Sequence, residues 1–153
     1  MTMAIVAAVA LALPAVALAA DKAIVISAKD VQAQIAKVIP QAKATGSGGG
    51  TLLKNGNLGM NLSVRTSSGG AEIHAHFDDV MIVQQGSATL ITGGTVVDAK
   101  TSAEGETKGP SIKGGTEQTI STGDTAVVPA GVPHQLLIKP GTVYAALVAK
   151  VKE

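Results

Sequence analysis

The sequence predicts an all-β domain, a single antiparallel jelly-roll β-barrel, with one short helix near its N-terminus. Two observations predict the fold class. From residue 52 onward, short apolar segments alternate with turn residues, and no helical spacing of apolar residues interrupts them. About eight such segments follow one another, which is typical of a jelly roll or barrel. A third observation concerns the core: Phe77 and Tyr144 are the only aromatic residues, so aliphatic side chains must fill it.

The clearest strand pattern lies in residues 58–65, where apolar residues alternate with polar or small ones, as in a half-buried strand. The strands around the histidine motif are expected at 71–77 and 79–85. Residues 98–116 are rich in Gly, Ser, Thr, Lys and Glu. This long connection is either a mobile lid over a cavity or a surface excursion, and the pattern leaves both interpretations open.

Residues 21–51 precede the barrel, which is assigned to residues 52–153. A short strand is expected at 22–26, followed by an amphipathic helix over about 28–39. Ser27 and Asp30 form a capping-box-like start, and Pro40 closes the segment. Residues 45–51 (TGSGGGT) have the composition of a flexible linker. The helical stripe, expected to dock on the domain, consists of Val31, Ile35 and Val38.

Residues 1–20 carry no charged side chain and are almost wholly apolar. They end in Ala17-Leu18-Ala19, a small-x-small cleavage pattern, and charge begins at Asp21. The segment is therefore interpreted as a signal peptide cleaved near Ala19 or Ala20, which predicts a secreted or periplasmic protein without stable membrane insertion after cleavage. An uncleaved anchor is the alternative, since the apolar run is close to the length that spans a bilayer.

Charge and cysteine content exclude some function classes. The formal net charge is +1 and the basic residues are scattered, so the sequence does not indicate a nucleic-acid-binding surface. The chain has no cysteine, which rules out disulfides and thiolate metal sites.

Chemistry is concentrated in the three histidines of the chain. His74 and His76 are one residue apart, and on an extended strand their side chains would point to the same face. His134 follows a turn sequence, Pro129-Ala130-Gly131. Imidazole is the commonest metal ligand in proteins, so this pattern predicts a metal site in which all three take part. The alternative is a pair of half-exposed strand histidines without a metal.

These residues resemble the two motifs of the cupin superfamily, over about residues 52–150. The second motif (Gly, five residues, Pro-x-Gly, two residues, His) is met in full, and the first (His-x-His, three or four residues, Glu, six residues, Gly) is met with departures. Asp replaces Glu, and only two residues separate it from the second His. The matching residues are Gly123, Pro129, Gly131 and His134 for the second motif, and His74, His76, Asp79 and Gly86 for the first.

The resemblance implies a barrel whose mouth holds a divalent metal such as Mn, Fe, Ni or Zn on His74, His76, His134 and Asp79. Such a donor set leaves coordination positions open for water or substrate. The shorter side chain of Asp79 leaves its role open. It could bind the metal directly, bind it through a water, or orient a histidine ring, or Asp78 could take its place.

Three further residues have two interpretations each. Glu72 shares strand parity with His74, so it is a candidate catalytic proton acceptor, although an exposed carboxylate at the strand start fits the pattern better. Arg65 is either an anion-binding residue or a solvated strand charge, and the pattern favours the second. Tyr144 is expected in the core rather than as a catalytic acid.

The leading hypothesis is an exported, metal-dependent enzyme acting on a small oxygen-rich molecule, with lyase, isomerase or dioxygenase chemistry all compatible. A non-catalytic cupin that binds a small ligand or metal is the second hypothesis, and a purely structural barrel is the third. The resemblance further implies a homodimer. Turnover of a substrate panel by the metal-loaded protein separates the first hypothesis from the second.

Overall fold

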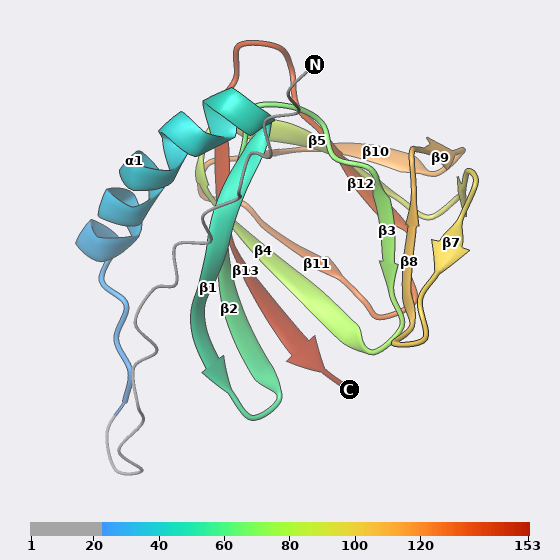
Figure 1. Cartoon of the computed structure of the whole chain (residues 1–153), viewed down its shortest axis with the longest axis horizontal. Coiled ribbons are helices and arrows are strands. Elements are labelled where there is room, and N and C mark those ends of the chain that lie inside the picture. Colours follow the sequence, from blue (N-terminus) through green and yellow to red (C-terminus); the bar gives the residue numbers. More distant parts are fainter. Residues whose placement is uncertain (1–22) are drawn as a thin grey trace, which may run out of the picture.

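Two antiparallel sheets face each other across the interior of the domain, and a single helix lies outside one of them (Figure 1). This computed structural model describes residues 23–153, so the predicted signal peptide lies outside the described residues. The arrangement confirms the predicted all-β jelly roll with its N-terminal helix. Within residues 23–153, no helix is long and apolar enough to cross a membrane.

The first sheet has five strands in the order β1-β2-β13-β4-β11. Their bounds are Ser47–Asn55 (β1), Leu58–Arg65 (β2), Tyr144–Lys152 (β13), Phe77–Gln85 (β4) and Thr125–Val128 (β11). The C-terminal strand β13 therefore lies in the middle, paired with β2 on one side and β4 on the other.

The second sheet has six strands in the order β10-β5-β12-β3-β8-β7. Their bounds are Thr116–Ser121 (β10), Ser87–Thr92 (β5), His134–Leu137 (β12), Ala71–His74 (β3), Glu106–Gly109 (β8) and Lys100–Thr101 (β7). Two short strands, β6 (Thr95–Val96) and β9 (Ile112–Lys113), pair with each other separately. The connection at 98–116 thus contributes β7 and β8 to the edge of the second sheet.

Helix α1 (Ala28–Thr45) begins as predicted, because the Ser27 side chain accepts a hydrogen bond from the Asp30 amide. Its predicted end is wrong, since the helix continues past Pro40. A proline inside a helix removes one backbone donor and crowds the preceding turn, and the packing of buried Ala42 beyond it offsets this cost. The helix ends at Gly46, whose left-handed backbone lets its amide donate to Ala42 O.

Two predictions at the N-terminal side are wrong. Residues 23–27 form no strand, and residues 47–51 are not a linker but the first half of β1, paired with β2. The glycines of this segment have a packing role. A Cβ on Gly48 would come within 2.7 Å of Val38 Cγ1, so glycine lets the strand run close under α1.

The alternation of β2 is confirmed, but its apolar side faces outward under the helix. Leu62 and Val64, with Ala145 of β13, pack against Val31 and Ile35 of α1. The other side of β2 therefore faces the interior, because successive side chains of a strand point to opposite faces. That side carries Asn61, Ser63 and Arg65. The interior of the domain is therefore polar beside β2. A second apolar cluster, which includes Val83, Leu90 and Tyr144, fills the rest of the interior.

Candidate metal centre

A cavity of about 400 Å³ lies between the two sheets. The first sheet supplies residues of β2, β4 and β13 to its wall, and the second sheet supplies residues of β3, β8 and β12. Its polar lining includes the interior side of β2 and most of the acidic and histidine residues singled out by the sequence. The cavity therefore contains most of the candidate site residues, namely Glu72, His74, Asp79 and His134.

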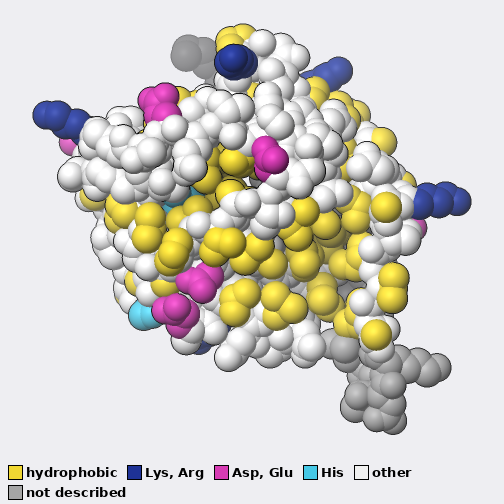
Figure 2. All heavy atoms as spheres, turned by 180° about the vertical axis from the view of Figure 1, so that it is seen from behind, with side chains coloured by type: hydrophobic (Ala, Val, Ile, Leu, Met, Phe, Trp, Pro, Cys, Tyr) yellow, Lys and Arg dark blue, Asp and Glu magenta, His cyan; other side chains and the backbone are white. Residues whose placement is uncertain are grey.

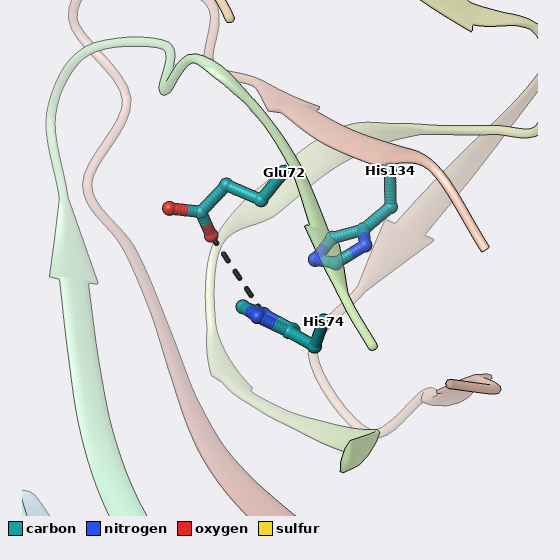
Figure 3. Close-up of side chains that lie close together, drawn as sticks. All are labelled: Glu72, His74 and His134. Carbon is teal, nitrogen blue, oxygen red and sulfur yellow. Dashed lines mark ion pairs between the residues drawn. The ribbon is translucent and has the colours of Figure 1, made fainter. Parts of the chain in front are cut away.

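Glu72, His74 and His134 come together in this cavity and point toward one another (Figure 3). One ligand atom from each lies within 4.8 Å of the others. Strand pairing explains the arrangement: Glu72 and His74 share one face of β3, and His134 at the start of β12 is the register partner of Glu72. The two imidazole rings are 5.1 Å apart between centroids. The spacing of these three residues would allow a metal ion to be held.

The hydrogen bonds of the two histidines direct one nitrogen of each toward the group. His134 Nδ1 lies 3.1 Å from Val132 O, and since a carbonyl only accepts, Nδ1 carries the proton. His74 Nδ1 donates in the same way to the Glu106 carboxylate. Both Nε2 atoms are then unprotonated in the neutral rings, as metal ligation requires. His74 Nε2 is buried and has no hydrogen-bond partner. These donors fit a divalent metal.

Asp79 lies beside this group. It is buried, and its Oδ2 is 3.4 Å from His74 Nε2 and 4.0 Å from His134 Nε2, distances of ion pairs rather than well-formed hydrogen bonds. Its other oxygen, Oδ1, accepts a hydrogen bond of 2.8 Å from Lys150 Nζ. Asp79 thus contacts the group on one side and a cation on the other.

The pKa values follow from these contacts. Interaction with the Asp79 carboxylate raises the pKa of His74 against the opposing effect of burial. Burial lowers the pKa of His134, which keeps that ring neutral. Burial alone would raise the pKa of Asp79, but its interactions with His74 and Lys150 outweigh burial and lower the pKa. Asp79 is therefore a carboxylate and His134 a neutral imidazole at neutral pH.

The structure does not bring His76 into the group. Strand β3 ends at His74, and His76 is exposed in the turn before β4, with its ring beside Gly105. The expectation that the two histidines share a strand face is wrong, because alternation stops where the strand ends. Asp78 also lies outside the group: its carboxylate accepts from the Ala130 amide at 2.8 Å and so holds the turn before His134.

The geometry suggests another register for the first motif, shifted by two residues. With Glu72 and His74 in the two histidine positions, four residues separate His74 from Asp79 and six separate Asp79 from Gly86, the spacing of the motif. The parity of Glu72 with His74 was the signal for its position. Nothing in the sequence pattern indicated Glu106, which comes from the 98–116 connection, or Lys150.

Comparisons with known proteins agree on the fold. No family model and no curated protein sequence matches this chain. Among solved structures, BH2720 from Bacillus halodurans is similar with a TM-score of 0.59 at 14% identity, over 88% of this chain and 84% of that one. The cupin domain of Schizosaccharomyces pombe Cnp3 is similar with a TM-score of 0.53 at 8% identity, over 70% and 65% of the two chains.

The DMSP lyase DddQ from Ruegeria pomeroyi DSS-3 is similar with a TM-score of 0.51 at 14% identity, over 70% of this chain and 47% of that one. At these identities the likeness concerns the fold. The chain has the cupin fold, as the two motifs predicted.

Proposed function

We propose that this chain is an exported metal-dependent cupin enzyme that acts on a small oxygen-rich molecule. The observation that carries the proposal is the group of Glu72, His74 and His134 around one point in a cavity, with the buried Nε2 of His74 left without a hydrogen-bond partner. A buried polar atom without a partner is costly, and a bound cation would satisfy it.

The donor set limits the metal. Two neutral imidazoles and one carboxylate, with positions left open, are typical of non-haem Fe(II) sites, and Mn, Ni or Zn accept similar ligands. A divalent ion held there would act as a Lewis acid toward a carbonyl or hydroxyl oxygen of the substrate, or support dioxygen chemistry. Lyase, isomerase and dioxygenase reactions all remain compatible with this set.

The protein's own residues prepare the site. Glu106 fixes the tautomer and the ring orientation of His74, and the Val132 carbonyl does the same for His134. Lys150 holds the Asp79 carboxylate beside both rings. In this arrangement Glu72 is a metal ligand in addition to a candidate proton acceptor. Asp79, beside both rings, is a second carboxylate that could accept a proton from a bound substrate.

A non-catalytic binding cupin is the second candidate. The observation that favours it is the ion pair between Lys150 and Asp79, because it neutralises a carboxylate that a metal would otherwise use.

Export and a homodimer complete the proposal of a metal-dependent enzyme. Residues 1–20 support export through their composition. The hydrophobic side chains gathered over the middle of the face in Figure 2 support a surface buried between two subunits.

The test is the metal content of the purified protein without a metal-binding tag, measured by elemental mass spectrometry after reconstitution. About one equivalent of a transition metal is expected in the wild type, and loss of the metal in His134→Ala. His76→Ala is the matched control, since His76 is exposed and outside the group. Metal far below one equivalent in the wild type, or equal loss in both variants, would overturn the proposal. Turnover of a substrate panel by the loaded protein then separates an enzyme from a binding protein.

A further inference from the structure

Three cations and three carboxylates line the cavity, and one cation has no ionic partner. Asp79 pairs with Lys150, Glu72 lies 3.5 Å from Lys108 Nζ, and Glu106 binds His74. The remaining cation is Arg65. In the part of the chain that the structure describes, no carboxylate lies within ion-pair distance of its guanidinium. Arg65 is thus the one lining cation that forms no ion pair with the described residues.

Arg65 is not the solvated strand charge that the sequence pattern favoured. It stands on the interior side of β2, and its Nε is buried without a hydrogen-bond partner. Its register partner on β13 is Tyr144, which also lines the cavity. Tyr144 is fully buried, as predicted, yet its hydroxyl has no partner either. The Nε–H of Arg65 and the hydroxyl of Tyr144 are therefore two neighbouring buried donors without an acceptor. Such donors are rare in native proteins.

The guanidinium is held in a defined place. It lies against Gly69, where an added Cβ would come within 2.8 Å of Arg65 Nη1. Gly69 is itself fixed, since its amide donates to Leu136 O and its carbonyl accepts from Gln135. Leu136 is two residues, roughly 7 Å, along β12 from His134. Arg65 therefore reaches from the first sheet to the second at a point near the metal centre.

We propose that Arg65 and Tyr144 form an anion subsite that binds the carboxylate of a small acid, whose other oxygens then face Glu72, His74 and His134. The subsite deepens the proposed function by naming its substrate class, and it rests on that function for the role of the other oxygens. A planar guanidinium matches a carboxylate by paired hydrogen bonds, and the tyrosine hydroxyl can donate a further one. Both lysines of the cavity are already paired with carboxylates, so the one unpaired guanidinium favours a monoanion over a phosphate dianion.

The test compares acids with their neutral amides. Glycolate and lactate, glycolamide and lactamide, and inorganic phosphate are titrated into metal-free and metal-loaded protein, with affinities taken from chemical-shift changes in NMR spectra. The acids are expected to bind more tightly than their amides in both forms. Arg65→Met is expected to weaken the acids by roughly 10- to 100-fold, and Tyr144→Phe by about 3- to 10-fold, with little effect on the amides.

Two further variants complete the design. Gly69→Ala should weaken the acids as well, because the new methyl group displaces the guanidinium while the backbone at Gly69 stays unstrained. Lys139→Met removes an equal charge from an exposed position and should leave the affinities unchanged. Gly69→Ala keeps the test decisive if Arg65→Met fails to fold.

The outcomes separate the subsite from the metal centre. Equal binding of acids and amides by a protein that holds its metal would overturn the subsite and leave the proposed function standing. Tighter binding of phosphate than of the acids would also overturn it. A preference for acids that depends on Arg65 in a protein that binds no metal would support the subsite and contradict the proposed enzyme.

Discussion

The ammonium group of Lys150 lies 2.8 Å from Oδ1 of Asp79, the residue that stands in the carboxylate position of the first cupin motif. Asp79 is 4% exposed, so its charge needs a partner inside the cavity. Lys150 supplies that partner from β13. A metal ion on the neighbouring group would therefore share this carboxylate with an internal cation.

Lys150→Met is expected to tighten metal binding by about tenfold, which corresponds to ~1.4 kcal/mol. The substitution removes a positive charge close to the metal centre and frees one oxygen of Asp79 as a possible ligand. Competition with a metal chelator of known affinity measures the change. Lys152→Met, which removes an exposed charge from the same strand, is the control. Weaker metal binding in Lys150→Met would show that the pair orients Asp79 rather than competing for it.

Glu106→Gln is expected to weaken metal binding by roughly 10- to 100-fold. The Glu106 carboxylate accepts the Nδ1 proton of His74 and so keeps Nε2 directed at the group, and an amide does this less well. The same chelator competition measures the effect. Glu104→Gln is the matched control, because Glu104 is exposed and lies on the same connection. Equal metal affinities in the two variants would show that Glu106 does not support metal binding.

Local patterns predicted a large part of this molecule. The turn before His134, the strand alternation of β2 and the start of α1 depend on neighbouring residues, and all three agree with the structure. His76 was misplaced because alternation says nothing about where a strand ends. Only two residues separate His76 from Asp79, one fewer than in the motif. This short spacing indicated that His76 was not the second histidine of the motif.

Other features depend on contacts that a linear pattern does not contain. The outward direction of the apolar side of β2 follows from the docking of α1, and only that docking turns Arg65 inward. A glycine-rich strand under a helix has the same composition as a flexible linker, so the sequence pattern did not predict β1. Glu106 and Lys150 reach the centre through strand pairing between segments far apart in the chain.

Tyr144→Phe is expected to change how stability depends on pH. Burial raises the pKa of the Tyr144 phenol from 10.0 to about 12. A raised pKa in the folded state stabilises the protein fully below pH 10, and this contribution is lost as pH rises toward 12. Urea unfolding from neutral pH to about pH 11 measures it. The wild type should lose stability more steeply than the variant above pH 10, and parallel curves would contradict the burial of this hydroxyl.

Ile35→Ala is expected to lower the free energy of unfolding by about 3 kcal/mol. Ile35 is 1% exposed and packs with Val64 and Ala145 in the cluster between α1 and the first sheet, so truncation leaves a cavity there. Urea unfolding measures the loss, with the exposed Lys37→Ala on the same helix as control. Because this cluster lies on the outer face of the sheet and the metal centre on the inner face, the metal content of the folded variant should equal that of the wild type. A loss below about 1 kcal/mol would show that the helix contributes little to the domain, and a loss of metal from the folded variant would show that the two faces of the sheet are coupled.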